Sequence, residues 1–241
     1  MQELKERILK EGKVLPGNIV KVDGFLNHRI DCKLMADIAD EFAKLFDLSK
    51  VDLILTAEAS GIALAAICAY RYGLPMVFAK KAKSDNIEGG LYQSEIYSYT
   101  YKKKVTQILS KEWLTSDNHV LILDDFMANG EAVRGLCELV EQAGAELVGV
   151  GIAIEKGFQG GGDRLRNMGV NYHALAVIEK ADENGIIFRE DQSVLHTASS
   201  RRVHPARRVF ANISARFVGT ATDLFACLCY TDARTKETEW F

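Results

Sequence analysis

The sequence predicts an α/β fold built on a mostly parallel sheet that is flanked by helices. Two observations lead to this fold class. Short apolar runs alternate along the chain with segments of helical periodicity, which is the order that right-handed strand–helix–strand crossovers produce. The apolar runs are also continuous, as expected for strands that are covered on both faces.

The predicted elements follow one another in a regular order. Apolar residues recur at helical spacing over 31–46, and the apolar segment 51–57 is a predicted buried strand. Further helices are expected at 62–72 and 131–142, and further strands at 76–79, 119–123, 146–154 and 172–179.

The region from Lys80 to Asn118 departs from this pattern. Residues 80–90 are polar and end in two glycines, and residues 94–109 alternate as an exposed hairpin does. We interpret the region as a flexible hairpin. It is either functional, with 97–110 covering a site, or a plain surface hairpin.

The last fifty residues have a different composition. Residues 192–241 hold seven basic and four acidic residues, which leaves 23 basic and 29 acidic residues in 1–191. The sequence therefore predicts one domain over 1–191 and a separate C-terminal extension over 192–241. The extension is either a basic interaction arm or a poorly ordered tail.

Composition limits the class of protein. The chain has 241 residues and a net charge of −3, so bulk electrostatics do not indicate a nucleic-acid partner. Charged residues are spread through the first twelve positions, and the longest apolar run, 61–70, is too short to span a membrane. The chain has five cysteines without metal-ligand spacing: Cys32, Cys68, Cys137, Cys227 and Cys229. Such cysteines suit reduced thiols, so a cytoplasmic protein is expected.

The segment 121–135 is the strongest candidate for a site. Asp124 and Asp125 follow an apolar strand that is expected to end at Leu123, at the strand edge where open α/β sheets bind ligands. The next residues form a small-residue turn that opens a helix, whose backbone N–H groups suit a phosphate: Ala128, Asn129, Gly130, Glu131 and Ala132. Adjacent carboxylates suit sugar hydroxyls or a magnesium ion. The alternative is a strand-end turn with a helix N-cap.

This combination of an acidic pair and a small-residue turn resembles the signature of the type I phosphoribosyltransferases. Five blocks, at 21–31, 56–63, 77–84, 122–132 and 141–159, resemble the bacterial xanthine branch of that family. The resemblance implies the fold of the family, with a small hood formed by the N-terminal segment and later strands. It also implies a homodimer that uses Mg²⁺ and transfers the phosphoribosyl group of phosphoribosyl pyrophosphate to N9 of xanthine.

The resemblance assigns roles to particular residues. Asp124 and Asp125 would bind the ribose hydroxyls, and either of them could also bind magnesium. Residues 128–132 would bind the 5-phosphate. Pyrophosphate would lie on the loop Glu58, Ala59, Ser60 and Gly61, with Lys80 and Lys81 beside it. Purine contacts are assigned to Val20, Asn27, Lys156 and Phe158. Without the resemblance, the loop would be a helix start capped by Ser60, Lys156 an exposed lysine and Phe158 a core residue.

Several residues depart from the family pattern. Ala128 stands where hypoxanthine-guanine enzymes usually have an aspartate, so no general base is assigned. Glu131 replaces a glutamine and would repel a phosphate unless it turns away. The glycine-rich segment 157–162 is expected to be a looser loop. Guanine or hypoxanthine as the base, and a non-catalytic regulator that senses phosphoribosyl pyrophosphate, are the alternative functions.

Overall fold

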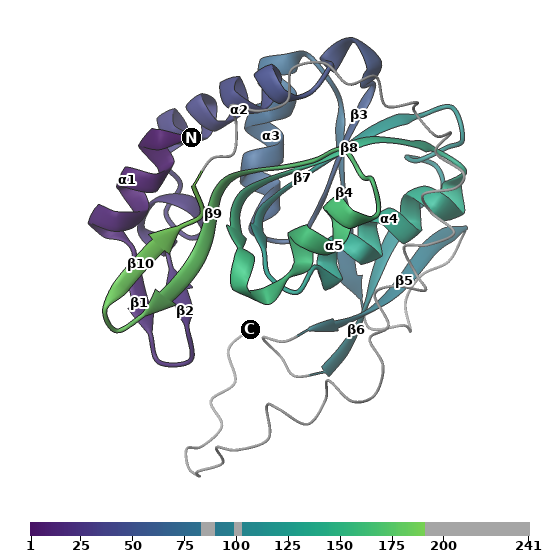
Figure 1. The fold of residues 1–241 in the computed structure, drawn as a ribbon. Helices are drawn as coiled ribbons and strands as arrows, with labels where there is room; N and C mark the ends of the chain where they lie inside the picture. The colour runs from purple at the N-terminus through teal and green to yellow at the C-terminus, as the bar shows by residue number, and fades with distance from the viewer. Residues whose placement is uncertain (83–89, 99–102, 191–241) are drawn as a thin grey trace.

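An eight-stranded sheet runs through the middle of the protein, with helices on both faces (Figure 1). The computed structural model describes residues 1–82, 90–98 and 103–190. The strand order is β10-β9-β8-β7-β3-β4-β6-β5. Strands β9, β8, β7, β3 and β4 are parallel to one another, while β10, β6 and β5 run antiparallel to their neighbours at the two edges. The predicted fold class is confirmed.

The elements have the following bounds. The helices are α1 (Gln2–Glu11), η1 (Asp23–Asn27), α2 (Cys32–Leu45), η2 (Leu48–Lys50), α3 (Gly61–Tyr72), α4 (Glu131–Ala143), η3 (Gly157–Gln159) and α5 (Gly161–Asn167). The strands of the main sheet are β3 (Leu53–Ala57), β4 (Met76–Ala82), β5 (Leu91–Ser98), β6 (Lys103–Ser110), β7 (His119–Met127), β8 (Glu146–Lys156), β9 (Tyr172–Asp182) and β10 (Gly185–Phe188). Strands β1 (Lys13–Leu15) and β2 (Ile19–Lys21) form a separate hairpin.

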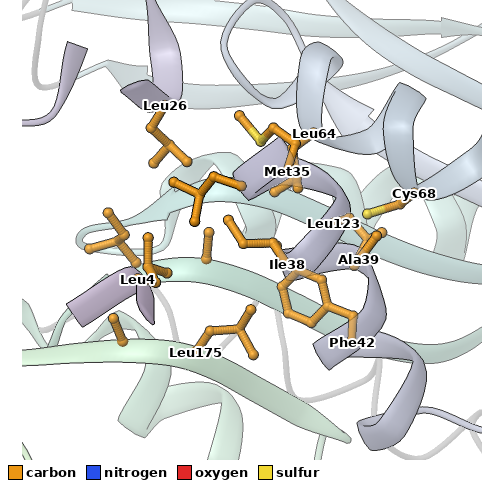
Figure 2. Packing of buried hydrophobic residues seen from close by; sticks show 14 of the residues in the cluster. Leu4, Leu26, Met35, Ile38, Ala39, Phe42, Leu64, Cys68, Leu123 and Leu175 are labelled. Carbon is orange, nitrogen blue, oxygen red and sulfur yellow. The ribbon is translucent and has the colours of Figure 1, made fainter. Parts of the chain in front are cut away.

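Each face of the sheet carries its own hydrophobic core. Leu121 and Leu123 of β7 pack with α1, α2 and α3, whereas Val120 and Ile122 pack with α4 and α5. Figure 2 shows the first core, where Phe42 and Ile38 of α2 lie over the sheet near Leu123 and Leu175. This alternation follows from the pleat of a strand, and it explains why the central strands are apolar at every position.

Most predicted elements are present: β4, β7, β8 and β9 are longer than expected, and β3 is shorter than the predicted 51–57. The helices expected over 31–46, 62–72 and 131–142 are α2, α3 and α4. The strand expected to end at Leu123 continues as β7 to Met127, so its predicted end was wrong. Sequence reasoning stopped at the first charged residue, but β7 stays paired with β8 through Asp124 and Met127. The acidic pair, Asp124 and Asp125, therefore lies inside a strand.

The hairpin over 94–109 is present as β5 and β6. It is not a separate excursion, because β6 pairs with β4 and continues the main sheet. Its inward side chains are buried, including Ser94, Ile96, Gln107 and Leu109. The turn of the hairpin and the segment after Ala82 lie outside the described residues, and so do the extension from residue 192, Cys227 and Cys229.

The N-terminal segment lies against the opposite end of the sheet, as expected for a hood. The β1–β2 hairpin lies beside β9 and β10 (Figure 1). The amino group of Met1 donates to the carbonyl of Leu175 in β9 at 2.6 Å. Among the helices of the described segments, none has the length and apolar character needed to cross a membrane. Cys68 and Cys137 are buried free thiols, and Cys32 is an exposed one.

Candidate active site

The acidic pair is buried near the carboxyl end of β7. Asp124 is 6 % exposed and Asp125 is 3 % exposed. The backbone N–H of Asp125 donates to Asp124 Oδ1 at 3.0 Å, and the hydroxyl of Ser60 donates to Asp125 Oδ1 at 2.9 Å. Asp125 Oδ2 is buried and has no hydrogen-bond partner within the described residues. A buried carboxylate oxygen without a partner is costly, so Asp125 Oδ2 has an unused capacity to accept a hydrogen bond.

The start of α3 packs directly on the acidic pair. A Cβ at Gly61 would lie 2.3 Å from Asp124 Oδ1 and 2.3 Å from Thr56 Oγ1, so only glycine allows this approach. Ser60 occupies the N-cap position of α3 but makes no side-chain capping bond. Its hydroxyl goes to Asp125 instead, which favours the site interpretation of Ser60 over the capping alternative.

Replacing Asp124 by asparagine should stabilise the fold at neutral pH. Burial and the neighbouring charge of Asp125 raise the pKa of Asp124 well above its ordinary value of 3.8. A carboxyl group with a raised folded-state pKa costs stability once the pH exceeds its unfolded pKa. We expect a gain of about 1 kcal/mol at pH 7, or about 2–4 °C in Tm. The gain should disappear below about pH 3.8, where Asp124 is protonated in both states.

Thermal unfolding of both proteins across a pH series measures this effect. Asp182→Asn is the matched control, because Lys180 holds the pKa of that half-buried carboxyl below its usual range. The control should not stabilise the protein. A D124N variant with an unchanged or lower Tm at pH 7 would contradict the prediction.

The predicted pyrophosphate loop connects β3 to α3. The Glu58 carboxylate accepts a hydrogen bond from the backbone N–H of Lys81, and the Glu58–Ala59 peptide bond is cis. Lys81 contributes to the wall of the cavity at the carboxyl edge, but Lys80, the next residue of β4, lines a different depression with Phe78 and Trp113. The structure brings Lys81 to the site and leaves Lys80 on the other face, because successive strand residues point to opposite faces.

The small-residue turn 128–132 lines a cavity of about 190 Å³. This volume holds several waters, and therefore a phosphate group. Lys81, Phe126 and Tyr97 complete much of the wall. Gly130 adopts φ +87° immediately before α4, so the turn residues lie at the N-terminus of a 13-residue helix. The unpaired N–H groups of such an end attract anions.

Helix α5 supports the turn from behind. A Cβ at Gly161 would lie 2.4 Å from the Ala128 carbonyl oxygen. Arg164 donates to the carbonyl of Asn129. A Cβ at Gly162 would lie 2.3 Å from Glu155 Oε1. The glycine-rich segment is therefore tightly packed, and the expectation of a looser loop was wrong: the small residues allow α5 to approach the turn and β8.

The predicted base residues lie on two parts of the chain. Lys156 ends β8, its Nζ lies 5.8 Å from the centre of the Phe126 ring, and burial lowers the pKa of its ammonium. Because Phe126 also lines the cavity, it links Lys156 to the turn. Phe158 follows in η3 and is 37 % exposed. Sequence reasoning did not single out Phe126.

The other two predicted base residues belong to the N-terminal hood. Val20 lies in β2, is 7 % exposed and belongs to the core on the α1–α3 face. Asn27 ends η1 and is half-buried. The structure places both in the hood, apart from the cluster formed by the acidic pair and the turn 128–132.

A buried ionic network supports the strand that carries Lys156. Glu155 is fully buried and accepts hydrogen bonds from both terminal nitrogens of Arg166 and, at 3.0 Å, from the Tyr172 hydroxyl. Asp163 then joins Arg166 at 2.6 Å to Arg189 at 2.9 Å. The network was not predicted, because its members come from different helices and strands and form no motif.

The chain is similar to known proteins of one family. A family model described as the phosphoribosyl transferase domain matches residues 30–164. The xanthine phosphoribosyltransferase of Alkaliphilus metalliredigens is 49 % identical over 195 residues, covering 81 % of this chain and 96 % of the relative. That of Bifidobacterium adolescentis is 50 % identical over 189 residues, covering 78 % of this chain and 98 % of the relative.

Solved structures show the same fold at lower identity. The adenine phosphoribosyltransferase of Giardia lamblia, complexed with 9-deazaadenine, superposes with a TM-score of 0.63 at 18 % identity and covers 73 % of this chain and 98 % of that one. The Trypanosoma brucei enzyme, in complex with AMP, pyrophosphate and ribose 5-phosphate, has a TM-score of 0.61 at 23 % identity and covers 85 % and 90 %. The fold, the acidic pair with its small-residue turn and these relatives lead to one conclusion: the chain belongs to the phosphoribosyltransferase family.

Proposed function

We propose that the protein transfers the 5-phosphoribosyl group of phosphoribosyl pyrophosphate to N9 of xanthine. The products are xanthosine monophosphate and pyrophosphate, as in purine salvage. One observation carries the donor half of this proposal: the buried acidic pair, the Ser60–Gly61 start of α3 and the turn 128–132 meet at the carboxyl ends of the adjacent strands β3 and β7. The identity of about half with xanthine enzymes supports the choice of base.

The donor is held by groups that match its parts. The ribose hydroxyls donate to Asp124 and Asp125, and the turn 128–132 takes the 5-phosphate with its backbone N–H groups. Pyrophosphate lies on Glu58–Gly61, with the Lys81 charge beside it. Lys80 points to the other face and has no part in this arrangement.

The base is read by residues outside this cluster. The Lys156 ammonium donates to a purine keto oxygen, and the exposed Phe158 ring stacks on the base. Asn27 offers both a donor and an acceptor to an edge of the purine, and Val20 contributes apolar cover from β2.

Magnesium fits the acidic pair. Asp125 Oδ2 is buried and unpartnered within the described residues, and carboxylate oxygens are the ligands that Mg²⁺ prefers. Asp125, with Asp124 beside it, would hold an ion that arrives with the donor. When bound, the ion would neutralise charge on the pyrophosphate.

Catalysis on this site is a matter of positioning and charge. Transfer breaks the bond from C1 of the ribose to pyrophosphate and forms the bond to N9, through a ribose that carries positive charge. The acidic pair orients the ribose and stabilises that charge, while Lys81 and the loop amides stabilise the leaving group. Ala128 cannot take the N9 proton, so the proposal requires a base that ionises readily, as xanthine does.

The protein is further proposed to act as a homodimer in the cytoplasm, with 1–191 as the transferase domain. Nucleic acid is not a proposed partner, and neither is a membrane.

Turnover with a panel of bases tests the function. Xanthine, guanine, hypoxanthine and adenine are each supplied with phosphoribosyl pyrophosphate and Mg²⁺, and pyrophosphate release gives kcat/KM for each. We expect the largest value with xanthine, and none with adenine, which has no keto oxygen for Lys156. Ribose 5-phosphate in place of the donor is the control and should give no release.

The possible results have distinct meanings. A preference for guanine or hypoxanthine would keep the reaction and replace the base. If the protein binds phosphoribosyl pyrophosphate but turns over none of the four bases, the proposed enzymatic function is contradicted. That result would favour a regulator that senses the donor.

A further inference from the structure

Glu131, the first residue of α4, is one of the residues that line the cavity at the turn 128–132. A phosphate monoester bound there carries close to two negative charges at neutral pH. Like charges a few ångströms apart, in a partly buried site, oppose each other by an amount that matters for binding. The sequence predicted this conflict, and the structure shows how the carboxylate is held.

The Glu131 carboxylate has two partners on the side of α4 that faces β5. Its Oε2 accepts from Arg134 Nη2 at 3.1 Å and from the backbone N–H of Tyr97 at 3.3 Å. The side chains of Glu131 and Arg134 are 20 % and 14 % exposed, so solvent screens this ion pair only partly.

Arg134 is itself fixed from two other directions. Its Nη2 donates to the carbonyl of Glu95 at 2.6 Å, and its Nη1 pairs with Glu138 one turn further along α4. Glu138 is in turn bonded by the Ser94 hydroxyl at 2.5 Å. Because Glu138 lies two turns from the start of α4, its charge is far from the turn 128–132, while the guanidinium stays beside Glu131.

We propose that Arg134 is a positioning residue that allows the turn 128–132 to accept a phosphate dianion. It neutralises Glu131 and, with the Tyr97 N–H, holds that carboxylate against β5. This inference rests on the proposed function, in which the turn binds the 5-phosphate of the donor. It concerns the side chains of this chain that make an acidic helix start compatible with that role.

A purely structural role for Arg134 gives a different expectation. Arg134 also clamps α4 to β5 through Glu95 and Glu138, and loss of the clamp would weaken binding whatever residue stands at 131. A charge-compensating role predicts that the effect of losing Arg134 depends on the carboxylate of Glu131. A double-mutant cycle separates the two roles.

The experiment uses Arg134→Gln, Glu131→Gln and the double variant in the full chain. Binding of ribose 5-phosphate is measured by calorimetry, and KM for phosphoribosyl pyrophosphate by turnover. Arg134→Gln should weaken phosphate binding roughly tenfold at low ionic strength, with KM for the base nearly unchanged. Glu131→Gln alone should strengthen phosphate binding, and in that background Arg134→Gln should cost about twofold or less.

Two further arms sharpen the result. The coupling should shrink in about 0.5 M KCl, because it is electrostatic. Arg134→Lys, which keeps the charge and loses the fork, should recover most of the affinity that Arg134→Gln loses. Arg71→Gln is the matched control: it removes an arginine paired with Asp40 on the exposed surface of α2 and α3, and should change neither constant.

The outcomes are distinguishable. Arg134→Gln could lower the phosphate affinity equally in the wild-type and Glu131→Gln backgrounds, or in neither of them. Either result would overturn the charge-compensation role while leaving the proposed function intact. A wild-type protein that binds neither ribose 5-phosphate nor phosphoribosyl pyrophosphate would overturn the proposed function itself. Circular dichroism and Tm of each variant verify that the comparison is made between folded proteins.

Discussion

Asp125→Asn should lower kcat/KM for phosphoribosyl pyrophosphate about 100-fold or more. Asparagine keeps the shape of the side chain, and its carbonyl oxygen still accepts the Ser60 hydroxyl that bonds Oδ1 at 2.9 Å. The change removes the negative charge beside the ribose. It also replaces the unpartnered Oδ2 by an NH₂ group, which cannot accept from a ribose hydroxyl or contact a cation.

Steady-state kinetics and unfolding together test this prediction. The kinetic loss should be accompanied by no loss of stability, because the variant also relieves repulsion with Asp124. Asp52→Asn is the matched control. Asp52 lies beside His119 at the amino ends of β3 and β7, so its loss should leave turnover unchanged. An Asp125→Asn enzyme with more than a third of wild-type activity would exclude the ribose contact.

Arg166→Met should destabilise the fold by about 3 kcal/mol. Glu155 is fully buried, and both of its oxygens are bonded by Arg166. Methionine fills the volume of the arginine stem but leaves a buried carboxylate with the Tyr172 hydroxyl as its remaining partner. The estimate lies at the lower end for a broken buried pair, because the Arg166 side chain is 34 % exposed.

Chemical denaturation of a set of variants measures the cost. The double variant Glu155→Gln, Arg166→Met should be more stable than Arg166→Met alone, since it removes the uncompensated charge. Arg71→Met, the same substitution in an exposed ion pair, should cost less than about 1 kcal/mol. If Arg71→Met and Arg166→Met lower the free energy of unfolding equally, the buried network contributes no more to stability than an exposed ion pair.

The network also has a kinetic readout. Glu155 directly precedes Lys156, so a shift of β8 in the Arg166 variant should raise KM for the base more than KM for the donor. Equal changes in both constants would indicate general loosening of the fold instead.

The core of the fold could be predicted because its signals are local. A continuous apolar strand and an amphipathic helix are both properties of adjacent residues, and α2, β3, α3 and α4 were found on that basis. The end of β7 was misplaced because a charged residue normally ends a buried strand, whereas here Asp124 remains paired with β8. The strands β1, β2 and β10 are too short to carry a periodic signal.

The candidate site was predictable to the extent that its residues are contiguous. The acidic pair and the turn 128–132 lie in one segment, and the Glu58–Gly61 loop lies in another. The contact between them, from Ser60 to Asp125, joins residues 65 positions apart and follows only from the parallel pairing of β3 with β7. Phe126 was missed because one aromatic residue in a strand is ordinarily a core residue.

Contacts that depend on how two elements approach each other could not be predicted from the sequence. Gly161 and Gly162 were interpreted as loosening a loop, whereas they allow α5 to reach the turn 128–132 and Glu155. Glu131 posed a problem of charge that the sequence could state, but its solution requires β5 to lie beside α4. No local sequence pattern predicts that β5 lies beside α4.

The side chains of α4 along β5 have a further consequence, for how copies of this chain can associate. Strand β5 is the last in the sheet order, and an open strand edge invites another strand to add to it. Here the backbone of Gln93 is bonded through both its N–H and its carbonyl to Gln142, and Arg134 and Glu131 take the carbonyl of Glu95 and the N–H of Tyr97. Another strand could extend the sheet over 93–97 only after displacing the residues that hold the helix start in place. The side chains of α4 therefore oppose extension of the sheet along residues 93–97 of this edge.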